Sequence, residues 1–194
     1  MKAPKNITGI ILAGGKSSRM GTDKGFLKLN GKLFIEHIIE VLNPLVSEVI
    51  IVSNNLNYDK FEAKRVNDLI EDAGPLAGIY SGLSASKTEK NLVLSCDIPL
   101  INIEVLTLLV EQTDEVSEII QIESNGKTMP LIALYNKKCE KVFESLLNQG
   151  ERRLRFAVSQ CKVKNLKLNT ELENYVSNVN TPEQLIEITT EHTH

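Results

Sequence analysis

The sequence predicts a three-layer, doubly wound α/β fold of the Rossmann-like type, with a mostly parallel sheet and an antiparallel hairpin in the C-terminal half. Short β-branched runs alternate with longer amphipathic stretches, a pattern typical of βαβ units around a buried parallel sheet. The dipeptide Asn125-Gly126 separates two later apolar runs, and this dipeptide favours a β-hairpin. The chain length of 194 residues fits one such domain.

The first half of the chain contains the strongest strand signal. Residues 7–13 are short, β-branched and followed by Gly14-Gly15, which predicts a buried strand that ends in a glycine turn. We expect GPLAG at 74–78 to form a turn ahead of a helix. The elements predicted in this half are strands at 7–13, 49–52, 64–66 and 92–95, helices at 33–42 and 79–85, and a short helix or turn at 58–62.

The second half is predicted from caps and apolar periodicity. Asn102 is a favourable N-cap for a helix over 103–111. Thr181 and Gln184 form a capping box at the start of the last helix, and Pro182 suits its first turn. The other elements predicted in this half are strands at 118–122, 129–135 and 163–168, and helices at 138–147 and 154–158.

Charge and composition exclude several classes of function. The chain has 22 Lys+Arg against 25 Asp+Glu, a net charge of −3, so no global positive field attracts nucleic acid or an anionic membrane. No apolar run approaches the roughly 18 residues of a membrane span. The cysteines Cys96, Cys139 and Cys161 form no CxxC pair, and no signal-peptide pattern precedes the first strand. We therefore expect a cytoplasmic protein without nucleic-acid or membrane partners.

The loop at 12–24, LAGGKSSRMGTDK, is the strongest functional feature. Its glycines allow backbone N–H groups to face phosphate oxygens, and its two serine hydroxyls add donors. Lys16, Arg19 and Lys24 add positive charge. The pattern differs from the Walker A loop and from G-x-G-x-x-G. It predicts a polyphosphate-binding loop at the carboxyl edge of the sheet.

Asp97 follows the predicted strand at 92–95 and should lie at the same edge of the sheet. Its carboxylate is a natural ligand for Mg²⁺, which prefers oxygen and is typically held by one or two carboxylates plus substrate phosphates. The neighbouring Cys96 is interpreted as a small buried residue and not as a nucleophile, because no base motif accompanies it.

The loop L-A-G-G-x-S-x-R-M-G-x-D-K closely resembles the signature of nucleotidyltransferases that transfer a nucleoside monophosphate from an NTP. Five landmarks follow it in order: Asn67-Asp68, GPLAG at 74–78, Cys96-Asp97-Ile98-Pro99, GERR at 150–153 and NVNTP at 178–182. Over roughly residues 7–188 the whole set is similar to the MobA-type molybdenum cofactor guanylyltransferase family, whose fold is that of the nucleotide-diphospho-sugar transferases. NVNTP favours this molybdopterin branch.

The resemblance implies transfer of GMP from Mg·GTP to the terminal phosphate of Mo-molybdopterin, with release of pyrophosphate. It assigns catalysis to Lys24, Asp97 and Arg19, with Asp97 as the Mg²⁺ ligand. The residues expected to bind GTP are Leu12, Ala13, Gly14, Gly15, Lys24, Ser53, Asn55, Asp68 and Asp97. The residues expected to bind the acceptor are Arg152, Arg153, Asn178 and Asn180. The resemblance also implies contact with molybdenum-cofactor biosynthesis proteins or apo-molybdoenzyme chaperones.

Some assignments stay open at the level of sequence. The base contact lies among Ser53, Asn54 and Asn55, and Asp72 is an alternative to Asp68. Within a single domain, we expect residues 1–100 to form mainly the GTP-binding half and 101–194 mainly the acceptor-binding half. The alternative functions are a cytidylyltransferase of the same cofactor, a sugar or polyol-phosphate nucleotidyltransferase, and a carrier that binds GTP or the cofactor without turnover.

Overall fold

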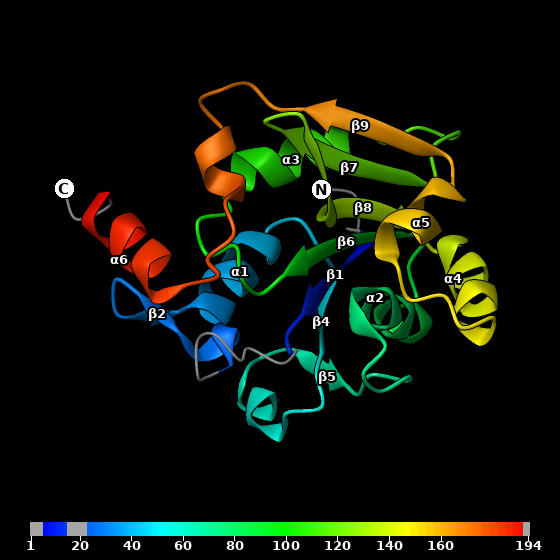
Figure 1. Ribbon diagram of the computed structural model, residues 1–194, viewed down its shortest axis with the longest axis horizontal. Coiled ribbons are helices and arrows are strands. Elements are labelled where there is room, and N and C mark those ends of the chain that lie inside the picture. The colour runs from blue at the N-terminus through cyan, green and yellow to red at the C-terminus, as the bar shows by residue number, and fades with distance from the viewer. Residues whose placement is uncertain (1–5, 15–22, 192–194) are drawn as a thin grey trace.

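The computed structural model describes residues 6–14 and 23–191 and contains a seven-stranded β-sheet (Figure 1). The strand order is β5-β4-β1-β6-β8-β7-β9. Strand β8 is antiparallel to both of its neighbours, whereas all other neighbouring pairs are parallel. Six strands therefore direct their carboxyl ends to one edge, which confirms the predicted mostly parallel sheet with an antiparallel strand in its C-terminal half.

The elements agree with the predicted ones over most of the chain. The strands are β1 (Ile7–Leu12), β2 (Lys28–Leu29), β3 (Lys32–Leu33), β4 (Glu48–Val52), β5 (Lys64–Val66), β6 (Lys90–Ser95), β7 (Ile119–Ser124), β8 (Lys127–Asn136) and β9 (Val163–Lys167). The helices are α1 (Phe34–Leu42), α2 (Gly74–Ala85), α3 (Ile103–Glu111), α4 (Cys139–Asn148), α5 (Leu154–Ser159) and α6 (Pro182–Glu191). The described residues also form the short 3₁₀ helices η1 (Lys24–Phe26), η2 (Leu56–Lys60) and η3 (Glu173–Val176). No helix in the described part of the chain is long and apolar enough to span a membrane.

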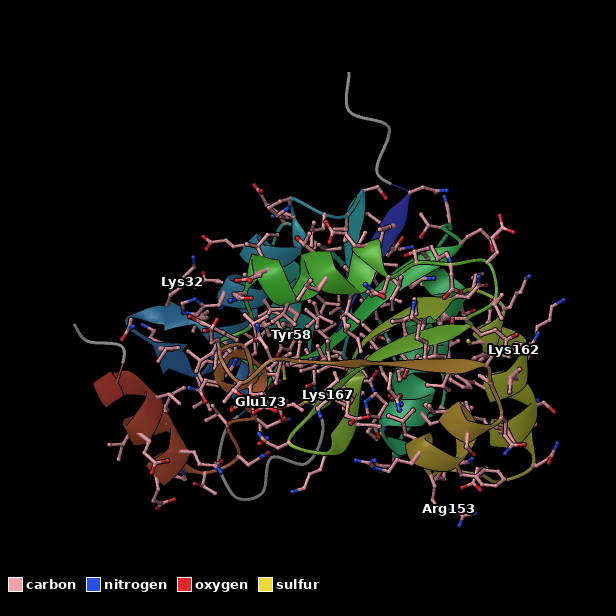
Figure 2. The ribbon with its side chains drawn as sticks, turned by 90° about the horizontal axis from the view of Figure 1, so that it is seen from above. Lys32, Tyr58, Arg153, Lys162, Lys167 and Glu173 are labelled. Carbon is pink, nitrogen blue, oxygen red and sulfur yellow. The ribbon has the colours of Figure 1, made fainter. Side chains whose placement is uncertain are left out.

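Alternate residues of the central strands enter two separate hydrophobic cores. Ile11 of β1 packs in the core that contains α1 and α3. Its neighbour Ile10 packs in the core that contains α2, α4 and α5. This division makes the fold three-layered, and Figure 2 shows helices above and below the strands. Because both faces are covered, the central strands are apolar on both sides.

The start of α2 differs from the predicted one, because GPLAG forms the first turn of the helix and not a turn ahead of it. Pro75 is tolerated there, since the first N–H groups of a helix have no partner within it. The glycines serve close packing on β1. A Cβ atom at Gly82 would lie 2.5 Å from Ile10 Cγ2, and one at Gly78 would lie 3.3 Å from Leu12 Cδ2. Glycine is typical of turns, but in α2 it allows the helix to pack closely against β1.

The described residues form two Asn-Gly hairpins, one of which was predicted from the sequence. Asn125 and Gly126 have φ of 51° and 69°, as the turn between β7 and β8 requires. Asn30 and Gly31, with φ of 50° and 81°, join β2 to β3 in a separate small hairpin. Helix α6 packs there through a small core that includes Leu29, and Figure 1 shows it beside β2.

Candidate active site

The site lies where β1, β4 and β6 end at the carboxyl edge of the sheet. Backbone hydrogen bonds continue past the strands: Ala13 N donates to Val52 O and Cys96 N donates to Leu12 O, both at 3.0 Å. Val179 N donates to Asp97 O at 2.8 Å, which ties a C-terminal segment to the same edge. Three segments that are remote in sequence therefore meet around Asp97.

Asp97 is the centre of a five-residue polar cluster. Lys24 Nζ lies 3.0 Å from Asp97 Oδ2, and Asn178 Nδ2 donates to Asp97 Oδ1 at 3.0 Å. Ser95 Oγ donates to the same Oδ1 at 2.5 Å. Lys24 Nζ also donates to Asn180 Oδ1, across 156 positions of the chain. The structure thus brings together Lys24, Asp97, Asn178 and Asn180 from the predicted catalytic and acceptor sets.

The side chains of Lys24 and Asp97 are 17% and 16% exposed. A ligand can therefore reach them, while water screens their attraction less than it would at the surface. This is the environment in which a fixed positive charge acts most strongly on a developing negative charge.

The NVNTP segment directs alternate residues to opposite sides. Asn178 and Asn180 are half-buried and face the cluster, whereas Val179 between them is 1% exposed in the small core with α6. Thr181 Oγ1 accepts from Gln184 N, as the capping box predicts. Gln184 Oε1 accepts from Asn180 N at 2.7 Å and not from Thr181 N. The start of α6 therefore holds Asn180 directly.

Asp23 is a functional candidate that the sequence analysis named only as a motif position. Its Oδ1 accepts from Gly25 N at 3.1 Å and from Tyr58 Oη at 2.6 Å, and its Oδ2 accepts from Asn55 Nδ2 at 3.1 Å. The bond to Gly25 caps η1, the turn that begins with Lys24. An Asp placed two residues before its backbone partner is a common cap, and that was the available signal.

The turn after β4 is built around Ser53 and Asn55. Ser53 is 4% exposed and its Oγ accepts from Asn55 N at 3.2 Å. A Cβ atom at Gly14, where φ is 144°, would lie 3.6 Å from Ser53 Oγ, so the end of β1 passes close to this turn. Both ends of the Asn55 amide bind protein groups, because its Oδ1 accepts from Asn57 N.

Asp68 is linked to the same turn and to α2. Its N donates to Asn54 Oδ1 at 2.9 Å, and its Oδ1 accepts from Ser81 Oγ at 2.9 Å. Half-burial raises the pKa of the Asp68 carboxyl. Asp72, the alternative, is exposed and has φ of 53° in the turn before α2. The structure thus connects Asp68 with the Asn54 turn.

Arg65 stabilises the turn after β4, a role that was not predicted from the sequence. Its Nη1 donates to Ser53 O at 2.9 Å, and its Nε lies 2.6 Å from Asp59 Oδ1. The Arg65 side chain is 13% exposed. A basic residue in a short edge strand carries no signal of such a role, because it is the usual solvated residue at that place.

The arginine turn at 150–155 is built differently. Arg153 binds Glu151 through both Nε and Nη2, at 2.9 and 2.7 Å, and Arg152 Nη1 donates to Leu147 O and Glu151 O. Hydrogen bonds from Arg153 lower the pKa of Glu151 to about 2. None of the described contacts of these arginines reaches Asp97. Figure 2 shows Arg153 at the margin of the molecule, apart from Tyr58.

The predicted loop is described only at its two ends. Leu12, Ala13 and Gly14 lie at the end of β1, and Lys24 begins η1. Gly15 and Arg19 lie outside the described residues. Their predicted roles in GTP binding and catalysis stay predictions.

The donor set around Asp97 fits a hard divalent cation. It offers carboxylate, hydroxyl and amide oxygens from Asp97, Ser95 and Asn180, which are the atoms that Mg²⁺ prefers. No group of three or more His, Cys, Asp or Glu residues capable of holding a metal occurs within residues 6–14 and 23–191. A cation held by one carboxylate would need further oxygens, and substrate phosphates are the usual source.

Residues 9–163 match the family model described as the MobA-like NTP transferase domain. The chain belongs to this family. As a MobA-like nucleotidyltransferase it is 36% identical to the "Probable molybdenum cofactor guanylyltransferase" of Flavobacterium johnsoniae, an alignment that covers 93% of this chain and 95% of that protein. The protein of the same name from Carboxydothermus hydrogenoformans is also 36% identical, over 95% and 97% of the two chains.

Solved structures agree with the family assignment. Molybdopterin-guanine dinucleotide biosynthesis protein A from Archaeoglobus fulgidus superposes with a TM-score of 0.81 at 25% identity, covering 95% of this MobA-like chain and 99% of that one. A 4-diphosphocytidyl-2C-methyl-D-erythritol synthase from Anaerococcus prevotii reaches 0.77 at 14% identity, over 98% and 97% of the chains. The second likeness shows the fold alone, and it confirms the predicted nucleotidyltransferase architecture.

Proposed function

We propose that the protein transfers GMP from GTP to the terminal phosphate of Mo-molybdopterin, giving the guanine dinucleotide cofactor and pyrophosphate. The observation that carries the proposal is the contact of Lys24 with both Asp97 and Asn180 at the carboxyl edge of the sheet. It joins a residue of the phosphate loop, the proposed metal ligand and the NVNTP segment. The relatives from Flavobacterium and Carboxydothermus are named probable molybdenum cofactor guanylyltransferases, so a guanine nucleotide and the molybdenum cofactor are the substrates to test.

In this reaction an oxygen of the acceptor phosphate attacks the α-phosphorus of GTP, and the bond from that phosphorus to pyrophosphate breaks. Such transfers depend on positioning and on spreading negative charge, with little covalent work by the protein. Lys24 Nζ is held by two oxygens in a partly buried site and supplies a positive charge there. A phosphate monoester has its second pKa near 6 and is already anionic at neutral pH, so the acceptor needs no strong general base.

The proposed metal is Mg²⁺. Asp97 would hold it, assisted by the hydroxyl of Ser95. When bound, Mg²⁺ would polarise the phosphoryl oxygens and orient the leaving group. The hydrogen bonds from Ser95 and Asn178 fix the rotamer of Asp97 beforehand, so the carboxylate is oriented before any substrate arrives.

The remaining assignments complete the proposal. We assign GTP to Leu12, Ala13, Gly14, Gly15, Lys24, Ser53, Asn55, Asp68 and Asp97, with Arg19 bridging the phosphates, and the acceptor to Arg152, Arg153, Asn178 and Asn180. Residues 1–100 then carry mainly the GTP half and 101–194 mainly the acceptor half. The free thiols Cys96, Cys139 and Cys161 fit a reducing cytoplasm. Transfer of the product to an apo-molybdoenzyme chaperone, or contact with other cofactor biosynthesis proteins, belongs to the same proposal.

Pyrophosphate release tests the proposal against its alternatives. The protein is incubated with Mg²⁺ and each of the four NTPs, with and without Mo-molybdopterin. We expect release with GTP only when the acceptor is present. Release with CTP alone among the NTPs would identify a cytidylyltransferase, and binding of GTP without release under any condition would identify a carrier. Asp97→Asn is the control for background hydrolysis.

A further inference from the structure

Three segments of the chain converge on the carboxylate of Asp23. Gly25 N belongs to η1, Tyr58 Oη to η2, and Asn55 Nδ2 to the turn after β4. Both oxygens of Asp23 are therefore engaged by protein donors. A carboxylate that accepts three such bonds is held in one position, and it holds its donors in return.

Tyr58 is the least ordinary of the three donors because its side chain is fully buried, at 0% exposed. A buried phenol needs a hydrogen-bond partner, and Asp23 Oδ1 at 2.6 Å is that partner. Burial raises the pKa of Tyr58 far above its usual range, so the hydroxyl stays a donor at any physiological pH. The ring is fixed by Phe26 of η1, with centroids 4.6 Å apart.

Gly25 shows how closely η1 approaches this tyrosine. A Cβ atom at residue 25 would lie 2.1 Å from Tyr58 Oη, which is too close for two non-bonded heavy atoms. The backbone on the C-terminal side of Lys24 therefore rests directly on the phenol. The backbone on its N-terminal side is part of Asp23, which the same phenol binds.

Lys24 lies between these two anchored residues, and its side chain ends at Asp97 and Asn180. A lysine side chain loses rotamer entropy when it is fixed in one position. Anchoring its backbone limits the volume that Nζ can explore. The contacts at Asp97 and Asn180 then need to select among few positions.

We infer that Asp23, held by Tyr58 and Asn55, is a positioning residue that sets Lys24 against Asp97 for the transfer reaction. This inference rests on the proposed function, because it assumes that Lys24 acts on the phosphates. It gives Asn55 a role through Asp23, and it gives a role in turnover to Tyr58, a residue of the hydrophobic core.

Tyr58→Phe tests the inference, with Tyr80→Phe as the matched control. Each variant loses one hydroxyl, and that of Tyr80 donates to Glu144 on the outer α2–α4 surface at 3.2 Å. We expect Tyr58→Phe to lower kcat for GMP transfer about ten-fold, because small misplacements of a reacting group cost that much or more. The KM for GTP should stay within about two-fold, since uniform binding is not lost. Tyr80→Phe should match the wild type.

A double-mutant cycle with Lys24→Ala separates positioning from general structural support. If Tyr58 acts through Lys24, adding Tyr58→Phe to Lys24→Ala will lower kcat no further. An equal loss in both backgrounds would overturn the inference, as would wild-type kcat in Tyr58→Phe. If Tyr58→Phe does not fold, Asp23→Asn, which keeps the size of the side chain, replaces it in the same double-mutant cycle. The same outcomes then support or overturn the inference. Absence of transfer by the wild type would instead overturn the proposed function.

Discussion

The segment at 14–28, which supplies Lys24 to the Asp97 cluster, and the arginine turn at 150–155 are both cationic in sequence, yet they differ in how their charges are held. Residues 14–28 carry four cations against Asp23, and residues 150–155 carry three against Glu151. In the cluster, Lys24 is bound by Asp97 and Asn180, which are remote in sequence. In the turn, Arg153 is bound by Glu151, two positions away.

The two regions differ in whether the positive charge is fixed in position by distant residues or only paired with a neighbouring carboxylate. The Arg153 side chain is 76% exposed, whereas that of Lys24 is 17% exposed. Solvent screens the exposed guanidinium of Arg153, so its ion pair with Glu151 contributes little. Contacts between distant segments fix the position of a charged group relative to the rest of the site. A contact between neighbouring residues chiefly lowers the net charge of that short segment. We therefore expect substitutions in the cluster to reduce turnover far more than those in the turn.

Asp97→Asn should have the largest effect. It removes the metal-binding charge and weakens the hold on Lys24, so turnover should fall about 10³-fold, at the upper end of losses for single electrostatic groups. Pyrophosphate release measures the loss, and circular dichroism checks that the fold survives. Wild-type turnover in this variant would discard the proposed role of Asp97.

Lys24→Ala should come next, with a loss of about 10²-fold in kcat. Lys24→Arg should recover little, because a planar guanidinium cannot replace a compact ammonium between Asp97 and Asn180. Lys28→Ala, at an exposed position on β2, is the matched control and should keep its activity. Equal losses in the two alanine variants would show that the net charge of the region matters and not the position of Nζ.

Asn180→Ala should weaken acceptor binding while GTP affinity is unchanged. Loss of one amide contact is expected to raise the KM for molybdopterin about five-fold, the usual worth of one hydrogen bond. Calorimetric titration with GTP and steady-state kinetics with the acceptor separate the two substrates. Equal weakening of both would mean that the acceptor site is misplaced.

Arg153→Met should have a smaller effect, raising the KM for the acceptor roughly three-fold, because the arginine must leave Glu151 before it can bind a phosphate. Glu151→Gln should lower that KM by releasing the guanidinium. Initial rates at varied acceptor concentration measure both. A 10²-fold change in that KM in either variant would show that the arginine turn is as important for the reaction as the Asp97 cluster.

The smallest effect is a pH dependence of stability at the turn. The pKa of Glu151 is lowered from 4.5 to about 2 in the folded protein, chiefly by hydrogen bonds from Arg153. A depressed folded-state pKa stabilises the fold above the unfolded pKa, and this contribution is lost as pH falls from about 4.5 toward 2. Thermal unfolding of wild type and Glu151→Gln across pH 2–6 should show a difference that shrinks toward the acid end. A constant difference would assign it to packing.

Elements with a local signal could be predicted from the sequence, and those with an ambiguous signal could not. The apolar run of β1 and the dipeptide Asn125-Gly126 have one interpretation each, and both were confirmed. The segment GPLAG has two possible interpretations, because proline and glycine are favoured both in turns and at the first turn of a helix. The close approach of Gly78 to Leu12, residues 66 positions apart, favours the helical alternative.

The sequence by itself determined the fold class, the phosphate loop and the residue types of the site, because strand periodicity, glycine turns and carboxylates after strands are local patterns. Only the tertiary structure decided that Lys24, Asp97 and Asn180 share one cluster while Arg152 and Arg153 do not, and that Asp23 is anchored by Tyr58. A hydrogen bond across 35 or 156 positions leaves no mark on the sequence near either partner. It forms because the parallel strands carry their carboxyl ends, and the segments beyond them, to a single edge of the sheet.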